Sequence, residues 1–560
     1  MKNSKRLIYI ISLLSMILLG GMFNSCQEEN LGYDKNGDLF QPKFIDVSLS
    51  DTSTPALVKS NSIALVWYKV NDADSYTVEL HFDNYYTSLF KSYTTTDTQI
   101  FMDDIPYKTQ YYIRVRANKA DSKFNSQWSY TSALTEDRPP YAQILNKVEK
   151  VNITENDVKV SWKIDVANPV DSISVVPASS KDVPAIGRKL TAEEIRIGQA
   201  KVEGLQKSTA YNVNVYDNTK SRVYDRPYNQ VTFRSSGPSA GQILVMKGDD
   251  LDALLRKNDL DPTIPEGTEY YLEAGSLFKV TPFTISKGFK LTGSNQGERP
   301  QIELNGNWNI KEGGYLSSLA FENIRFYQTI DASYFFNSGN SWTIGEVTFY
   351  NCVFNNFRRG FWRHQGNGKY KEVGNFEMNY CTLDMNGGHS GPYGTFALGS
   401  AGADNFKRAV FSNCTFMRDY YTIGTEVPDK TRNFKNLFDY GASTYPIYLE
   451  YNNVTIYDYA YNRSLINIPS AVGSTLVFKN VVLASACGKV IQAIAAGCTT
   501  TYSNNYTTTD YLLGPTSIQG TALGISALNL FVDPKAGNLK IKDPNSPVVI
   551  TKSGDTRWLP

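Results

Sequence analysis

Three short segments of this 560-residue chain gather arginine, histidine and aromatic residues directly after an alternating, strand-like run. These runs are "NCVF" (351–354), "YCTL" (380–383) and "NCTF" (413–416). A guanidinium group pairs with a carboxylate through two parallel hydrogen bonds, and an aromatic ring offers its apolar face to a sugar ring. The segments therefore predict a groove that binds an acidic glycan. The predicted binding residues are Arg358, Arg359, Trp362, Arg363, His364, His389, Tyr393, Arg418 and Tyr420.

Catalysis by the same segments is a second hypothesis. A polysaccharide lyase needs a base beside the uronate, and Ca²⁺ or an arginine to neutralise the carboxylate. The candidate bases are Arg359, Arg363 and Lys369, and the candidate Ca²⁺ ligands are Asp384, Glu372 and Glu377. No segment matches a lyase active site, and no paired aspartates of the kind that a hydrolase uses occur on consecutive runs. Whether the chain is an enzyme stays open, and a binding protein would need no cofactor.

The strand-like runs belong to a repeat that must position these side chains. Its units begin 28, 29, 33, 40, 27 and 24 residues apart. A period in the twenties with variable insertions predicts a solenoid, because a single unit cannot bury its own apolar face. No helix fills the intervals, so a parallel β-helix is expected. The starts are Asn323, Asn351, Tyr380, Asn413, Asn453, Asn480 and Asn504.

Stacking of the units predicts ladders of equivalent residues about 4.8 Å apart, so the three segments that follow these runs would lie within ~10 Å of each other along one edge. Cys352, Cys381 and Cys414 share one position and are interpreted as an internal column of thiols. The asparagines before them can form amide ladders. The residues predicted to fill the interior are Phe326, Phe354, Leu383, Phe416, Ile456 and Leu483.

The flanks of the repeat fit this interpretation. Residues 248–258 predict a short helix with an apolar stripe of Leu251, Leu254 and Leu255, which would cap the open end of the coil. The segment "FTISKGFKLTGSNQGERPQIEL" (283–304) resembles the opening turns of pectate-lyase-like β-helices, and residues 530–549 resemble their last coil. This resemblance implies a right-handed parallel β-helix over residues 240–560, with pectic polymers as the implied substrate class.

Two all-β segments precede the repeat. Residues 41–137 alternate apolar and polar side chains, with Trp67 in an early strand and Tyr111 after "IPYKT". These positions resemble the tryptophan and the tyrosine corner of the fibronectin type III module. Residues 140–236 repeat the pattern with Trp162 and Tyr211. The predicted fold class is all-β, with two fibronectin type III-like sandwiches before the β-helix, and the sandwiches are expected to act as a spacer.

The N-terminus reads as an export signal. Basic residues precede an apolar run from Leu7 to Leu19, which is too short for a spanning helix. The N-terminal segment ends at Cys26, which "QEEN" follows, and this pattern resembles a lipoprotein signal with a surface-export tag of the Bacteroidetes type. The resemblance implies removal of residues 1–25, acylation of Cys26, a tether over residues 26–40 and a surface-exposed location on the outer membrane.

The whole arrangement resembles Bacteroidetes surface lipoproteins that accompany polysaccharide-utilisation systems. This resemblance implies a uronate-containing polysaccharide as partner, with a glycan transporter complex as a further candidate. The net charge of +1 provides no general attraction to nucleic acid. Five cysteines remain besides Cys26, an odd number that does not suggest a disulfide framework. An adhesin or scaffold that uses the flank of the β-helix is a further alternative.

Overall fold

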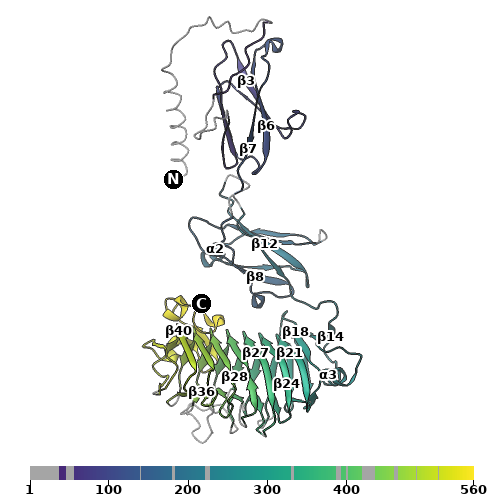
Figure 1. Cartoon of the computed structure of the whole chain (residues 1–560), viewed down its shortest axis with the longest axis vertical. Coiled ribbons are helices and arrows are strands. Elements are labelled where there is room, and N and C mark those ends of the chain that lie inside the picture. Colours follow the sequence, from purple (N-terminus) through teal and green to yellow (C-terminus); the bar gives the residue numbers. More distant parts are fainter. Residues whose placement is uncertain are drawn as a thin grey trace. The chain divides into compact units, whose positions relative to one another are not determined.

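The computed structural model is an all-β chain with short helices (Figure 1). The predicted leader, Cys26 and the tether up to residue 36 lie outside the described residues. The structure describes residues 37–45, 56–138, 141–179, 183–220, 227–329, 333–357, 359–366, 368–385, 393–398, 402–418, 436–459, 464–486, 489–514 and 516–560. Within these ranges, no helix has the length and hydropathy that crossing a membrane requires.

The first sandwich has the strand order of a fibronectin type III module. One sheet has the order β1-β2-β5 and the other β4-β3-β6-β7, with antiparallel pairing. Trp67 and Tyr111 are buried between the sheets, as their positions in the sequence predict. The strands are β1 (Ala56–Lys59), β2 (Ser62–Val66), β3 (Ser75–His81), β4 (Leu89–Thr95), β5 (Gln99–Met102), β6 (Gln110–Asn118) and β7 (Ser129–Leu134), and a 3₁₀ turn, η1 (Ser122–Phe124), precedes β7.

The second sandwich pairs the order β10-β9-β12-β13 with β11-β8. Trp162 and Tyr211 are buried, and the Tyr211 hydroxyl accepts a hydrogen bond from the Gln206 backbone N–H at 2.8 Å, as in a tyrosine corner. The irregular middle of this segment contains α2, whose N-terminus is capped by Thr191. The elements are η2 (Lys150–Asn152), β8 (Asp157–Ser161), β9 (Ser172–Pro177), β10 (Ile186–Lys189), α2 (Ala192–Ile197), β11 (Gln199–Glu203), β12 (Ala210–Tyr216) and β13 (Val231–Arg234).

A parallel β-helix follows, and its coils form three sheets in which each strand pairs with the equivalent strand of the next coil (Figure 1). The first sheet contains β14 (Ile243–Val245), β15 (Thr268–Leu272), β18 (Phe289–Gly293), β21 (Gly314–Glu322), β24 (Trp342–Tyr350), β27 (Lys371–Asn379), β30 (Asp404–Phe406), β31 (Arg408–Ser412), β34 (Tyr448–Asn452), β37 (Thr475–Lys479) and β40 (Thr499–Ser503).

The second sheet contains β16 (Leu277–Val280), β19 (Gln301–Leu304), β22 (Arg325–Gln328), β25 (Val353–Asn355), β28 (Thr382–Asp384), β32 (Thr415–Met417), β35 (Thr455–Tyr457), β38 (Val482–Ala484), β41 (Tyr506–Thr507) and β42 (Thr521–Ala522). The third sheet contains β23 (Phe336–Ser338), β26 (Trp362–His364), β29 (Phe396–Ala397), β33 (Phe438–Asp439), β36 (Ser464–Ile468) and β39 (Ile491–Ile494). The short pair β17 (Thr284–Ile285) and β20 (Asn309–Ile310) precedes the third sheet.

The predicted interior columns are confirmed by the register of the second sheet. The apolar column runs in this order: Phe326, Phe354, Leu383, Phe416, Ile456, Leu483. All of these side chains are buried, and Phe326 stacks on Phe354 with ring centroids 5.4 Å apart. Cys352, Cys381 and Cys414 are buried free thiols at one position of successive coils. Burial raises the pKa of Cys352 and Cys414, as expected for inert interior thiols.

The asparagine ladder also forms, and the backbone explains why asparagine recurs. Every start of the repeat has a positive φ of 50° to 56°, a left-handed conformation that asparagine tolerates better than most residues. The Asn351 side chain donates to the Asn323 side chain at 2.7 Å, and Asn480 donates to Asn453 at 2.8 Å. Tyr380 interrupts this ladder because its side chain has no amide.

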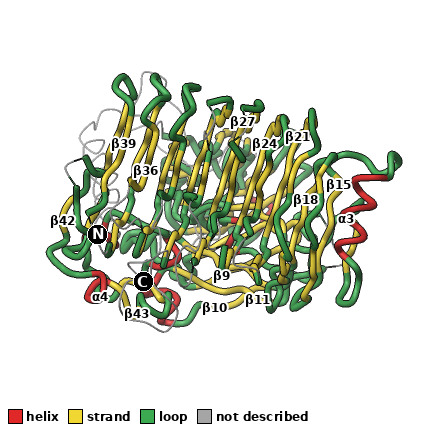
Figure 2. The backbone as a smooth tube through the Cα atoms, turned by 90° about the horizontal axis from the view of Figure 1, so that it is seen from below, coloured by secondary structure: helices red, strands yellow, loops and turns green. Residues whose placement is uncertain are grey.

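The helix predicted at the start of the coil is α3 (Leu251–Leu260), which lies at one end of the row of strands (Figure 2). The Asp250 side chain caps it by accepting a hydrogen bond from the Ala253 backbone N–H at 3.0 Å. Leu251 and Leu255 belong to the core of the β-helix, and Leu254 packs against it. The helix therefore covers the interior at the first coils, as predicted.

The prediction that residues 530–549 form a last coil is wrong. They contain an antiparallel hairpin of β43 (Phe531–Asp533) and β44 (Asn538–Ile541), followed by α5 (Pro547–Ile550). Together with α4 (Ala527–Leu530), this tail packs on Met417, Tyr457 and Ala484 at the outer face of the second sheet. The tail packs against this face through its own apolar residues. The sequence of the tail therefore resembles that of a buried coil.

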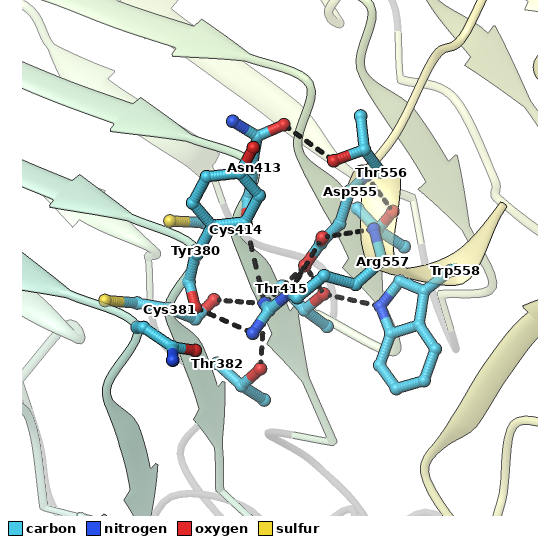
Figure 3. Close-up of polar contacts among 12 residues, drawn as sticks. Tyr380, Cys381, Thr382, Asn413, Cys414, Thr415, Asp555, Thr556, Arg557 and Trp558 are labelled. Carbon is cyan, nitrogen blue, oxygen red and sulfur yellow. Dashed lines mark hydrogen bonds and ion pairs between the residues drawn. The ribbon is translucent and has the colours of Figure 1, made fainter. Parts of the chain in front are cut away.

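The last residues then run back across the coils as a clasp, which we define as residues 553–558 and which includes η4 (Thr556–Trp558). Ser553 contacts the Asn504 carbonyl, Gly554 the Asn480 carbonyl, and Asp555 the Thr455 hydroxyl. Figure 3 shows the far end of the clasp, where Arg557 donates to the carbonyls of Tyr380 at 2.7 Å and Cys381 at 2.9 Å. Arg557 thus supplies hydrogen bonds at the coil where Tyr380 interrupts the asparagine ladder.

Candidate functional site

Two of the predicted arginines and one predicted tyrosine meet beside the third sheet. The guanidinium carbon of Arg363, on β26, lies 3.8 Å from the centre of the Tyr393 ring. It also lies 5.5 Å from the centre of the Tyr334 ring, and the corresponding distance from Arg359 to that ring is 5.6 Å. We call Tyr334, Arg359, Arg363 and Tyr393 the arginine–tyrosine cluster. The structure therefore brings three of the predicted residues together: Arg359, Arg363 and Tyr393.

The ring of Tyr334 lies under the guanidinium groups of Arg359 and Arg363, and the sequence did not predict this role. Its side chain is almost fully buried, and its hydroxyl accepts a hydrogen bond from Arg359 Nε at 3.1 Å. Burial raises the pKa of Tyr334, so the phenol stays neutral at physiological pH. Gly360 allows this packing, because a Cβ there would lie 2.9 Å from the Tyr334 ring. The string "DASYFF" (331–336) precedes the coil that contains Arg359 and Arg363. Its tyrosine, just before a strand of the third sheet, is the sequence feature that could have identified this residue.

Among the described residues, Arg363 has no carboxylate partner, whereas Arg408 and Arg418 of the β-helix each form an ion pair. Its remaining polar contact is with the side-chain oxygen of Asn337 at 3.5 Å. Arg408, on the first sheet, also lies over a tyrosine but pairs with Glu377. A partly exposed guanidinium that is held against rings and has no anionic partner among the described residues suits an external anion.

Arg418 does not join this cluster. It follows β32 of the second sheet, and it forms an ion pair with Asp384, donating from Nε at 2.9 Å. A second donation reaches the carbonyl of Lys535 in the C-terminal tail at 2.9 Å. Arg418 therefore connects the tail to the coil, and it does not belong to the same surface as Arg363.

Trp362 and His364 were predicted to bind the glycan, but both side chains point into the coil and are buried. Residues alternate along β26, so placing Arg363 outside puts its two neighbours inside. Trp362 is fully buried and stacks on Phe336 with ring centroids 4.1 Å apart. His364 is buried with Lys371 and Asp404, and none of the three faces solvent.

The contacts of His364 indicate which of its ring nitrogens carries the proton. Trp362 Nε1 can only donate, and it donates to His364 Nε2 at 3.2 Å. The neutral ring therefore carries its proton on Nδ1, which lies 3.4 Å from Asp404 Oδ1. Burial lowers the pKa of His364, in agreement with a neutral ring.

The residues considered for a lyase are dispersed. Glu372 and Glu377 lie on β27 of the first sheet and pair with Lys407 and Arg408, whereas Asp384 lies on the second sheet. Lys369 pairs with Glu312 at 2.7 Å. Across the described part of the chain, no three histidine, cysteine, aspartate or glutamate side chains come together as a metal site. The described residues thus do not combine a base with a Ca²⁺ site.

Three further predicted residues, Arg358, His389 and Tyr420, lie outside the described residues. The arginine–tyrosine cluster forms a cationic, aromatic surface that can pair with a carboxylate and pack against an apolar ring face. Neither reaction chemistry nor a bound metal is needed for such contacts.

Solved structures that are similar to the chain include fibronectin domains. No protein-family model and no curated protein matches the chain. Among solved structures, the chain is similar to three fibronectin domains of chicken CNTN1, with 15% identity, a TM-score of 0.16, and 36% of this chain and 67% of that chain covered. It is also similar to a two-domain fibronectin type III segment of chicken tenascin, with 17% identity, a TM-score of 0.15, and 35% and 99% covered. With scores this low, the fold assignment rests on strand order and register.

Proposed function

We propose that this protein is a lipid-anchored protein of the cell surface that binds an acidic, uronate-containing polysaccharide through the arginine–tyrosine cluster. The observation that carries the proposal is Arg363, whose guanidinium lies 3.8 Å from the Tyr393 ring centre without a carboxylate partner among the described residues. A uronate offers a planar carboxylate for the guanidinium fork and a ring face for the tyrosine.

The location of the protein is proposed from the sequence. A basic start, a short apolar run and Cys26 before "QEEN" resemble an exported lipoprotein, and acylation anchors a protein without a spanning helix. Two sandwiches between the anchor and the β-helix suit a device that holds its binding surface away from a membrane. A neighbouring glycan transporter complex fits this proposal as a partner.

Retention on immobilised polymers tests the binding proposal. The test compares the wild-type protein with the double variant R359A/R363A on polygalacturonate and on a neutral glycan. The matched control is R408A, which removes an arginine that also lies over a tyrosine but already has Glu377 as a partner. We expect the double variant alone to lose retention on polygalacturonate, and added salt to weaken wild-type retention.

The same samples separate binding from turnover. Release of unsaturated oligosaccharides by the wild type and not by R359A/R363A would make the protein a lyase. Unchanged retention of R359A/R363A on polygalacturonate, together with no turnover, would refute the proposed site. Thermal melting of each variant checks that the β-helix remains folded.

A further inference from the structure

The first sandwich carries a second cationic, aromatic surface, on the outer face of the sheet that contains β3, β6 and β7 (Figure 1). Buried and partly exposed residues alternate along β6, so Arg114 and Arg116 lie on the face turned away from the sandwich core. We propose, as an extension of the proposed function, that this face binds a second uronate of the same polysaccharide. We call Tyr86, Arg114, Arg116, Trp128 and Tyr130 the sandwich ladder.

The ladder alternates aromatic rings and guanidinium groups. The guanidinium carbon of Arg114 lies 5.3 Å from the centre of the Tyr86 ring and 4.3 Å from that of the Trp128 ring. The guanidinium carbon of Arg116 lies 4.7 Å from the Trp128 ring centre, so the indole contacts both arginines. Tyr130 packs on Tyr86 with ring centroids 5.0 Å apart. These contacts hold two flexible cationic side chains in place before a ligand binds.

One arginine of the ladder keeps an uncompensated charge. Arg114 forms an ion pair at 2.7 Å with Glu79, its partner on β3. Arg116 lies opposite Thr77 instead, and its Nε donates to the side-chain oxygen of Asn118 at 3.2 Å. Among the described residues, Arg116 has no carboxylate partner. Its positive charge is therefore available to an external anion, and its planar fork suits a carboxylate.

Tyr130 supplies an exposed ring beside this charge. Its exposed fraction is 55%, and it pairs with Arg114 across β6 and β7, so both side chains lie on the outer face. Arg116 follows two residues later on the same strand, which places it roughly 7 Å further along the face. A short stretch of an acidic glycan can thus pair a carboxylate with Arg116 and lay a sugar ring against Tyr130.

The chemistry of the ladder favours an acidic glycan over a neutral one. A neutral sugar would contact the ring of Tyr130 and leave the guanidinium of Arg116 without an anion, whereas a uronate uses both. The ladder offers one such cation where the arginine–tyrosine cluster contains two arginines, so we expect the ladder to bind more weakly by itself. An immobilised polymer presents many uronates, and engagement of both surfaces then strengthens retention.

The test compares R116A/Y130A with the wild type on a short galacturonate oligosaccharide and on immobilised polygalacturonate. Calorimetry with the oligosaccharide should give the wild-type dissociation constant for the stronger site, because the variant leaves the arginine–tyrosine cluster intact. Retention on the polymer should fall. Since joining two binding sites raises affinity by about 10²–10⁴, we expect the apparent affinity for the polymer to drop by at least roughly tenfold.

The matched control is K91A. Lys91 also lies over a tyrosine of this sheet, 5.0 Å from the centre of the Tyr93 ring. K91A therefore removes the same charge outside the ladder, and it should keep wild-type retention. Y130A is a milder variant, because more than half of the Tyr130 side chain is exposed and both arginines remain. It should stay folded even if R116A/Y130A does not, and it should lose part of the retention.

Wild-type retention of Y130A and R116A/Y130A, or an equal loss in K91A, would overturn this inference. The variant R359A/R363A decides the proposed function separately. If R359A/R363A loses retention and R116A/Y130A does not, the proposed function stands without a second site. If R359A/R363A binds as the wild type does while R116A/Y130A loses retention, the proposed function fails and the site on the sandwich remains.

Discussion

The guanidinium carbon of Arg363 lies 3.8 Å from the centre of the Tyr393 ring, although the two residues come from successive coils of the β-helix. This contact holds a flexible cationic side chain against a rigid ring. Arg363 therefore loses less conformational freedom when an anion binds than a fully solvated arginine would. The arrangement favours recognition of a ligand that is both anionic and ring-shaped.

Tyr393 should contribute to binding through its ring and not through its hydroxyl. Y393F keeps the ring and is expected to bind an acidic oligosaccharide as the wild type does. Y393L removes the ring, which is worth about 0.5–1 kcal/mol in an exposed cation–π contact, so we expect binding weaker by roughly two- to fivefold. Calorimetric titration measures both variants, and equal losses in Y393F and Y393L would contradict this role of the ring.

Asn351 should stabilise the coil through both its backbone and its side chain. Its φ is 50°, and its amide donates to Asn323 at 2.7 Å. N351G keeps the backbone and loses the amide bond, which costs about 1 kcal/mol of unfolding free energy. N351A also meets the left-handed backbone with a Cβ, at a further cost of about 1 kcal/mol. Urea denaturation should rank the stabilities as wild type, N351G and N351A, and a reversed order of the two variants would refute the backbone argument.

Arg557 should hold the clasp on the coil. Asp555 is fully buried and pairs with Arg557, and its Oδ2 also accepts from the Thr415 hydroxyl at 2.6 Å. R557A would leave this buried carboxylate without its cation, so we expect a loss of roughly 3–5 kcal/mol of unfolding free energy. Thiol labelling under native conditions should also become faster at Cys381, whose carbonyl Arg557 binds. R196A, which removes an exposed arginine of α2, serves as the control.

His364 should make the β-helix less stable in acid. Burial lowers the pKa of its ring in the folded protein from the usual 6.5, so the unfolded chain binds the proton more readily. The contribution of His364 to stability is thus fully present above pH ~6.5 and is lost as the pH falls below it. H364Q can still accept from Trp362 and donate towards Asp404 but does not titrate. Its melting temperature should change less between pH 7 and pH 5 than that of the wild type, and parallel changes would exclude His364 as the source.

The sequence predicted what repeats and missed what occurs once. The interior column from Phe326 to Leu483 was predictable because each coil must bury the same position, and the recurring asparagines marked the same bend. Trp362 and His364 were misplaced because the run "FWRHQ" contains polar and apolar residues whose alternation does not state which face is inside. A buried histidine is acceptable there only because Trp362 and Asp404 contact its ring, and such partners come from the fold.

The tail shows the same limit. Residues 530–549 have the apolar residue pattern of a coil, but they cover the outer face of the second sheet instead of extending that sheet. Hydrophobic pattern alone does not distinguish a strand that continues a stack from one that packs on its flank. The contact between Arg557 and the Tyr380 carbonyl joins residues 177 positions apart and has no local signal in the sequence.

The central claim is that Arg363 binds a carboxylate of the glycan, and one titration addresses it directly. The dissociation constant of a galacturonate oligosaccharide is measured by calorimetry for the wild type, R363A and R408A. Because a hydrogen bond to a charged group contributes about 1.5–3 kcal/mol, R363A should bind roughly ten- to a hundredfold more weakly, whereas R408A should match the wild type. Equal dissociation constants for all three proteins would contradict the claim.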